Sequence, residues 1–149
     1  MRELVHPEHQ QLYDYWNQKR GDRIAPARVD IDPLDFPSLL PYLCMYKVHL
    51  DPLEYETTLM GTSVVDMWGV DYTGKLVKDI VLGPLYASVK MHFDTVIRDK
   101  KPTVHDLDAS WIDKHYIKYS RLMLPLSENG QDVDRLLVCI ILHTTETLH

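Results

Sequence analysis

Hydrophobic and polar residues alternate with a period of two between residues 43 and 60. The segment 43–50 reads LCMYKVHL. The segment 54–60 reads EYETTLM, in which Tyr55, Thr57 and Leu59 alternate with glutamate and threonine. Only a short turn at Asp51-Pro52 separates the two segments. This alternation predicts an antiparallel hairpin that has one wetter face.

Two longer stretches carry apolar residues at steps of three and four, which predicts helices. The first follows Pro7 and stops before Gly21, since proline suits a first helical turn and glycine the position beyond the last. The second lies within residues 83–102 and ends before Pro102. Between residues 22 and 42, four prolines rule out a long helix and predict a wrapping segment that leads into the sheet.

The stretch 55–75, YETTLMGTSVVDMWGVDYTGK, predicts a strand, a turn and a helix of about two turns. We expect Gly61 to permit a sharp exit from the strand, and Gly69 to end the helix with a positive φ. Trp68 stands at the end of this helix, where it is expected to form a wall of the core or of a pocket. No catalytic role is expected for it.

The last third of the chain predicts three strands, at 103–109, 115–127 and 134–145. The last two form a hairpin through the turn at Asn129-Gly130, and the continuous apolar run of the final strand places it in the middle of the sheet. The order of elements predicts an α+β domain with helices on one face of an antiparallel sheet. We expect one structural unit, with an N-terminal helix and wrapping segment at 1–41 and a sheet domain at 42–149.

Composition excludes several classes of function. The 149 residues carry a net charge of −6 and no basic block, which argues against nucleic-acid binding. The longest apolar run, 136–142, is too short to span a bilayer, and the N-terminus lacks an apolar signal core, so we expect a cytoplasmic protein. Cys44 and Cys139 lie in apolar segments and are expected to be buried thiols. No CxxC pair or glycine-rich phosphate loop occurs, and no metal site is expected.

Several motifs together resemble a family of short, stand-alone PAS-like proteins found mainly in alphaproteobacteria. The resemblance rests on five places: Tyr15-Trp16, Arg28 to Pro33, Gly61-Thr62, Gly69 to Gly74, and Leu124 to Gly130. The chain departs from the pattern at Met67-Trp68, where an aliphatic-aromatic pair such as Leu-Phe is expected, and this changes the bulk of one pocket wall.

The resemblance implies a fold and a broad role. PAS domains have a five-stranded antiparallel sheet with small helices between the second and third strands. They sense small ligands or cofactors, or they mediate dimerisation and partner docking, and the fold alone does not choose among these roles. The family resembles sensory or regulatory modules of signal transduction that have no attached kinase or output domain.

A small apolar or acidic ligand would fit between the helices and the inner face of the sheet. The residues expected to line that space are Leu59, Val65, Trp68, Tyr86, Val89, Phe93, Tyr119 and Arg121. Arg121 is a lone cation among apolar neighbours. It could clamp a ligand carboxylate, pair with an acidic residue or, most simply, point outward from an edge strand.

Three alternatives stay open. A small enzyme would use His105, Asp106 and His115 as acid-base groups, although a solvated turn is the simpler interpretation of that segment. A haem sensor would bind iron through His92, which is more simply a hydrogen-bonded histidine. A homodimer would form through the aromatic stripe of the first helix, formed by Leu12, Tyr15 and Trp16, although packing on the chain's own core is the simpler role. A protein partner of unknown identity is also compatible with the sequence.

Overall fold

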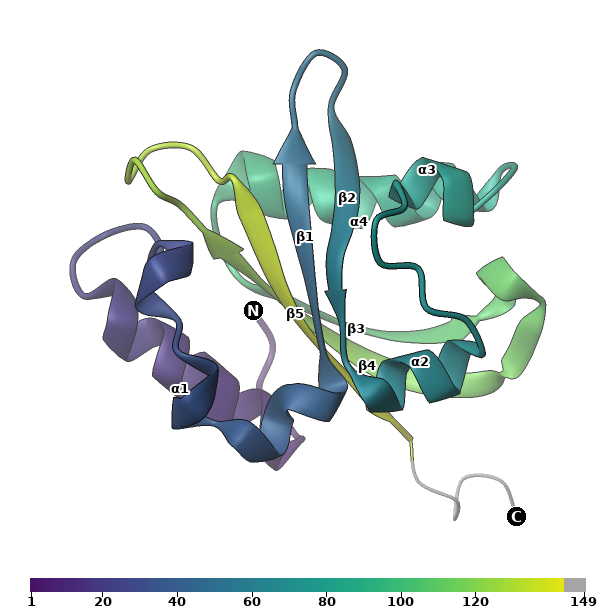
Figure 1. Cartoon of the computed structure of the whole chain (residues 1–149), viewed down its shortest axis with the longest axis horizontal. Helices are drawn as coiled ribbons and strands as arrows, with labels where there is room; N and C mark the ends of the chain where they lie inside the picture. Colours follow the sequence, from purple (N-terminus) through teal and green to yellow (C-terminus); the bar gives the residue numbers. More distant parts are fainter. Residues whose placement is uncertain (144–149) are drawn as a thin grey trace.

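The computed structural model describes residues 1–143 and contains one antiparallel sheet with strand order β2-β1-β5-β4-β3 (Figure 1). The strands are β1 (Leu43–His49), β2 (Glu54–Met60), β3 (Thr103–Ala109), β4 (Lys114–Leu126) and β5 (Arg135–Leu142). The α-helices are α1 (Pro7–Arg20), α2 (Thr62–Trp68), α3 (Val77–Ile80) and α4 (Leu85–Asp99). Four 3₁₀ turns complete the chain: η1 (Arg28–Asp30), η2 (Pro33–Asp35), η3 (Pro37–Tyr42) and η4 (Ser110–Ile112).

The predicted α+β class, the five strands and both hairpins are confirmed, and β5 lies in the middle of the sheet between β1 and β4. The predicted continuation of the last strand through residues 144 and 145 lies outside the described residues. Helices cover both faces of the sheet and not one. Alternate residues of β5 point to opposite sides, Leu136, Val138 and Ile140 toward α2–α4 and Leu137, Cys139 and Ile141 toward α1. Both sets are buried, which explains why the strand has no polar alternation.

Helix α1 packs on the second face of the sheet. The side chains of Leu12 and Trp16 are 0% and 3% exposed, and Nε1 of Trp16 donates to the carbonyl oxygen of Pro125 at 2.7 Å. The hydroxyl of Tyr15 donates to the carboxylate of Asp35 at 2.8 Å. Leu12 and Trp16 therefore belong to the chain's own core, which was the simpler of the two roles expected for the stripe, and Tyr15 is partly buried beside them.

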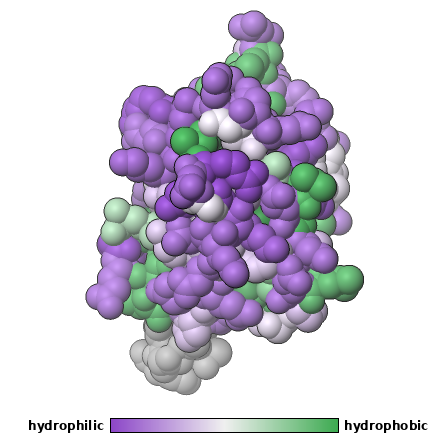
Figure 2. Space-filling view, turned by 90° about the vertical axis from the view of Figure 1, so that its left-hand side faces the viewer, coloured by the Kyte–Doolittle hydropathy of each residue, from purple (hydrophilic) through white to green (hydrophobic). Residues whose placement is uncertain are grey.

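The outer surface on the α1 side of the molecule does not form a broad apolar face. Figure 2 shows the side of the molecule that Figure 1 has on the left, and this side is mainly hydrophilic with small, separate hydrophobic areas. Large contiguous apolar patches often mark interaction sites on soluble proteins. The polar outer side of α1 follows from its sequence, because its buried residues are few: His9, Leu12 and Trp16.

Gly61 and Gly69 bracket helix α2, as the sequence indicates, but for two different physical reasons. Gly69 ends the helix with φ 84°, a left-handed conformation that glycine adopts without strain. Gly61 has φ −68°, which any residue can adopt, so backbone freedom is not what the exit from the strand requires. A Cβ atom at Gly61 would lie 2.3 Å from the carbonyl oxygen of Pro41. Close approach of η3 to the start of α2 is what requires glycine there.

The two cysteines occupy adjacent strands and face opposite layers. In the β1–β5 pairing, Cys44 lies opposite Val138 and Leu43 opposite Cys139. Cys44 belongs to the core under α2–α4, whereas Cys139 belongs to the core under α1. Both are buried free thiols, as predicted, and burial raises the pKa of each. Because the backbone of the sheet separates them, the two sulfurs cannot form a disulfide.

Candidate functional site

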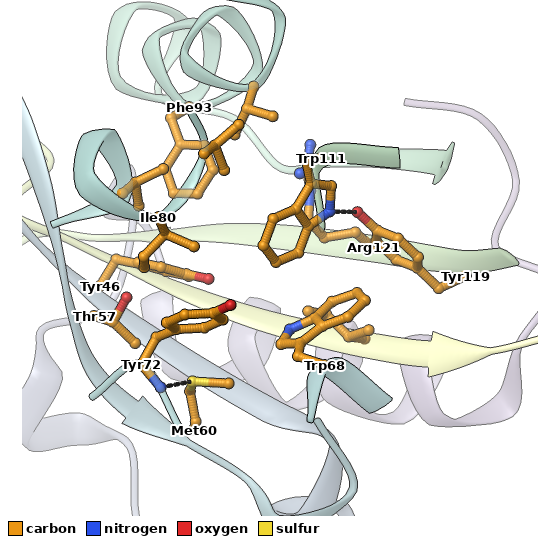
Figure 3. A pocket seen from close by; sticks show the side chains of 14 residues that line it. Tyr46, Thr57, Met60, Trp68, Tyr72, Ile80, Phe93, Trp111, Tyr119 and Arg121 are labelled. Atoms are coloured by element: carbon orange, nitrogen blue, oxygen red, sulfur yellow. Dashed lines mark hydrogen bonds between the residues drawn. The ribbon is translucent and has the colours of Figure 1, made fainter. Parts of the chain in front are cut away.

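A cavity of about 50 Å³ lies between the inner face of the sheet and helices α2 to α4 (Figure 3). We call it the inner cavity. Its walls are mainly aromatic and aliphatic, with hydroxyl groups and one arginine among them. The lining residues are Tyr46, Thr57, Met60, Trp68, Tyr72, Val77, Ile80, Val81, Val89, Phe93, Trp111, Tyr119, Arg121 and Ile140.

One end of the inner cavity is formed by two tryptophans brought together from distant segments. The ring of Trp68, from the last turn of α2, lies edge-on to the ring of Trp111, from η4, with centroids 4.9 Å apart. Nε1 of Trp111 donates to the hydroxyl of Tyr119 at 3.2 Å, and the Trp68 ring also packs on Tyr119 at 5.0 Å. Lys114 Nζ donates to the carbonyl oxygen of Trp68 at 2.9 Å and so fixes the end of α2 against β4.

A bulge in β2 decides which of its side chains enter the cavity. Met45 pairs with Leu59 and Tyr46 with Thr57, so that Thr58 is an extra residue on β2, and its hydroxyl donates to the carbonyl oxygen of Met45 at 3.1 Å. An extra residue reverses the faces that follow it. Leu59 therefore points outward and is 43% exposed, while Met60 lines the cavity.

Arg121 projects from β4 toward α4 and lies beside Trp111 and Tyr119 in the wall of the inner cavity (Figure 3). Only 6% of the residue is exposed, which corrects the simplest expectation that it points outward. Its Nη2 donates to Nδ1 of His92 at 2.8 Å, and its guanidinium lies 5.7 Å from the centroid of the Phe93 ring. The Nε atom is buried and has no hydrogen-bond partner among residues 1–143.

Three carboxylates on the neighbouring elements α4 and β3 bind groups other than Arg121. Asp94 of α4 accepts from the hydroxyl of Tyr55 and from Lys90 Nζ. On β3, Asp106 accepts hydrogen bonds from Ser120 Oγ at 2.6 Å and from Arg2 at 2.8 Å. Asp108 accepts a hydrogen bond from the backbone N–H of Ser110. None of the ion pairs found within the described chain includes Arg121.

A second, larger hollow of about 260 Å³ lies between α4, β3 and η4, and we call it the outer pocket. Its lining includes His92, Leu107 and two carboxylates, Asp106 and Asp108. Four residues line both spaces: Val89, Trp111, Tyr119 and Arg121. Arg121 thus stands between a mainly apolar interior and a more polar vestibule.

Histidines beside Arg121 are held in their neutral form. The rings of His92 and His105 stack with centroids 3.9 Å apart. Burial, and then the positive charge of Arg121, lowers the pKa of His92 to about 4, and the same causes lower the pKa of His105. Because arginine has no acceptor, Nδ1 of His92 must accept the hydrogen bond and carry no proton. The group can bind an anion through its guanidinium, but it contains no negative charge of its own.

The structure brings together five of the eight predicted lining residues: Trp68, Val89, Phe93, Tyr119 and Arg121. The prediction is wrong for Leu59, because of the bulge. Val65 and Tyr86 are partly buried but do not line the inner cavity. Sequence reasoning missed the other nine lining residues, which are Tyr46 of β1, Thr57 and Met60 of β2, Tyr72 of the loop after α2, Val77 and Ile80 of α3, Val81 after it, Trp111 of η4 and Ile140 of β5. The period-two spacing places Thr57 on the same face of β2 as Tyr55. It is the one signal that could have indicated Thr57 as a lining residue.

The acid-base group proposed from sequence does not assemble. His105 faces α4, where it stacks on His92, whereas Asp106 lies on the opposite face of β3, where it binds Ser120 and Arg2. His115 is exposed at the start of β4. Neighbouring residues of a strand point to opposite faces, so His105 and Asp106 cannot act on one substrate atom.

The residues present do not fit a haem group bound through His92. Its Nδ1 accepts the hydrogen bond of Arg121, and the outer pocket that His92 lines, at about 260 Å³, is smaller than the roughly 300–1,000 Å³ typical of sites for drug-sized ligands. Within residues 1–143, no group of three or more potential metal-binding side chains is found. Of the helices in the same range, none combines the length and hydropathy of a membrane-spanning segment.

Comparisons with known proteins agree with this architecture. A family model described as PAS domain matches residues 4–141, and so runs through the boundary expected at residue 41. The solved structure of the PAS domain of BvgS from Bordetella pertussis is similar, with a TM-score of 0.52 and 20% sequence identity over 79% of this chain and 93% of that one. At that identity the likeness shows the fold alone. No curated protein matches the sequence.

Proposed function

Because the chain belongs to the PAS domain family, we propose that it is a sensory or regulatory module whose signal is a small molecule bound in the inner cavity. The observation that supports this most is the cavity itself, an interior space bounded by aromatic side chains and one buried cation. Ligand sites are typically concave and mostly apolar, with a few fixed polar groups that orient the ligand.

The proposed response is a change in how α2, α3 and α4 pack on the sheet. All three helices supply lining residues, among them Trp68, Val77 and Val89. A ligand that binds better to one arrangement of these helices shifts the population toward it. The hydrogen bond between Lys114 and the carbonyl of Trp68 links α2 to β4 and would be sensitive to such a shift.

Native mass spectrometry of the full chain tests the proposal. The protein is incubated with a bacterial small-molecule extract and desalted, and we expect a non-covalent adduct below 500 Da (a limit set by about 300 Å³ of combined space). Val89→Phe fills the wall shared by both spaces and should reduce the adduct. Met91→Phe adds the same ring at an exposed position of α4 and is the matched control. Equal adduct in both variants, or none in the wild type, would contradict a ligand in this cavity.

A further inference from the structure

Arg121 is a buried cation without a counter-ion in the described structure. Three arginines at the surface do have a counter-ion. Arg2, Arg23 and Arg98 each pair with an aspartate at 2.8 to 3.0 Å. Exposed pairs of that kind contribute little to stability, whereas a buried charge is costly unless it is paired and hydrogen-bonded. The one arginine that most needs an anion lacks one in the chain that is described.

The groups around the guanidinium do not replace that anion. His92 of α4 accepts one hydrogen bond, and Phe93 presents the face of its ring. His105 from β3 stacks behind His92 and is also neutral, since burial and the charge of Arg121 lower its pKa. Tyr46 from β1 is a further neighbour in the lining, and burial raises its pKa well above the usual value, so its hydroxyl stays protonated. Asp106 and Asp108 line the adjoining outer pocket, but no carboxylate of the described residues pairs with the guanidinium itself.

The donors that remain suit a carboxylate. A guanidinium presents its N–H groups as a planar fork that matches two carboxylate oxygens. Nη2 is engaged with His92, while Nε has no partner among the described residues. One guanidinium supplies one positive charge, and no lysine lines either the inner cavity or the outer pocket. A monoanion is matched by this charge, whereas a phosphate ester would be left with excess negative charge.

The space limits the size of the ligand. On the scale where one water needs about 10–15 Å³, the inner cavity has room for roughly three to five water positions. Its lining also includes Trp68, Tyr72 and Ile80, whose apolar surfaces favour an apolar group (Figure 3). The arginine also borders the outer pocket, whose lining is more polar and includes Asp106 and Asp108.

Resting on the proposed function, we propose that the ligand is a small monocarboxylate whose carboxylate binds the guanidinium of Arg121 and whose short aliphatic or aromatic body enters the inner cavity. The carboxylate of the ligand supplies the counter-ion that no described residue provides for Arg121. It also completes the hydrogen bonding of Nε, which no described residue satisfies.

The test uses matched pairs of probes that differ in charge and hardly in shape. Propionate is compared with propionamide, and benzoate with benzamide, by following the three tryptophan indole N–H signals of the full chain in ¹H–¹⁵N NMR spectra at pH 7. Trp68 and Trp111 line the inner cavity, whereas Trp16 lies on the opposite face of the sheet and is the internal control. We expect at least one carboxylate to shift the first two signals and not the third, with at least tenfold higher affinity than its amide.

Two variants locate the effect at Arg121. Arg121→Met removes the cation and keeps an unbranched stem, and it should weaken carboxylate binding at least tenfold while leaving amide binding unchanged. Lys118→Met removes one charge from the same strand at an exposed position and is the matched control for net charge. A folded Arg121→Met protein that binds the carboxylate as tightly as the wild type overturns the inference. Arg121→Lys provides a second measurement, with intermediate affinity expected because the charge stays and the fork is lost.

The outcomes separate this inference from the function on which it rests. If amides shift Trp68 and Trp111 as well as carboxylates do, the cavity binds ligands but the carboxylate assignment is wrong. If neither class of probe shifts these signals at 20 mM (about 2 kcal/mol of binding free energy at the 1 M standard state), both the carboxylate assignment and the proposed ligand cavity are overturned.

Discussion

Nη2 of Arg121 donates to Nδ1 of His92 at 2.8 Å, and this contact joins β4 to α4 at the boundary between the inner cavity and the outer pocket. Both residues are titratable in principle, but only one carries charge near neutral pH. Burial and the adjacent cation lower the pKa of His92 to about 4, so the pair is a cation hydrogen-bonded to a neutral ring. The pKa of His92 therefore reports the charge at Arg121.

The first prediction follows from this coupling. Arg121→Met should raise the pKa of His92, because the positive charge of Arg121 is the second cause of its depression after burial. A carboxylate bound at Arg121 should raise it in the wild type for the same reason. Side-chain NMR titration between pH 8 and pH 4.5 measures the onset of protonation. His9, on the other face of the sheet, should titrate unchanged, and an unchanged His92 in Arg121→Met would show that the two groups are not coupled.

The second prediction concerns the cost of the buried cation. Arg121→Met should raise the free energy of unfolding of the ligand-free protein by about 1–2 kcal/mol, because an apolar side chain replaces an unpaired buried charge. Residues kept for binding often reduce stability in this way. Urea denaturation at pH 7 measures the change, and Lys118→Met should stay within about 0.5 kcal/mol of the wild type. Destabilisation by Arg121→Met would instead assign Arg121 a structural role.

The third prediction is a loss of stability in acid. Burial lowers the pKa of His9 from 6.5 to about 4, partly offset by the hydrogen bond to the carbonyl oxygen of Cys139. As the pH falls below 6.5, the unfolded chain takes up this proton and the folded chain does not, so the free energy of unfolding decreases until about pH 4. The loss from His9 is roughly 3 kcal/mol at pH 4. The lowered pKa values of His92 and His105 act in the same direction.

Unfolding midpoints in urea at pH 7 and pH 4.5 measure this loss. His9→Gln keeps a hydrogen-bond donor and removes the titrating ring, so the difference between the two midpoints should become smaller. His115→Gln, at an exposed position, should behave like the wild type. If His9→Gln lost as much stability as the wild type between the two pH values, His9 would not be a source of the acid sensitivity.

The fourth prediction tests the close approach at the start of α2. Gly61→Ala would place a methyl group 2.3 Å from the carbonyl oxygen of Pro41, against backbone that cannot rotate away. We expect a loss of about 1–3 kcal/mol in the free energy of unfolding. Thr62→Ala changes the exposed neighbouring residue and should have a much smaller effect. Thermal unfolding followed by circular dichroism compares the two, and equal melting temperatures would contradict the steric argument.

The fifth prediction separates core packing from self-association on α1. Trp16→Ala should reduce the free energy of unfolding by about 3–5 kcal/mol, because it empties a buried site and removes the donor to Pro125. Sedimentation velocity of the folded fraction should show the same oligomeric state as the wild type. If the variant kept its stability but changed from dimer to monomer, Trp16 would belong to a dimer interface and not to the core. Tyr13→Ala, on the same helix and partly buried, should cost less.

The sequence by itself determined the elements, because each element is fixed by local preferences. The strand at 54–60, the bounds of the helix between Gly61 and Gly69, and the hairpin at Asn129-Gly130 all agree with the structure. The same patterns identified the fold class and the shared space under the helices. Local spacing also identified Trp68, Val89 and Phe93 as lining residues, since each lies on the apolar face of its helix.

Only the tertiary structure decided what the side chains meet. The extra residue at Thr58 reversed the faces of Leu59 and Met60, because the register of a strand is set by its partner and not by its own pattern. The burial of Arg121 depends on α4 crossing above β4, which is a contact between segments 29 residues apart. Whether Trp16 is core or interface depended on which face of the sheet α1 covers. Alternation along a strand shows that two faces exist, and only the packing of the layers assigns each face its neighbours.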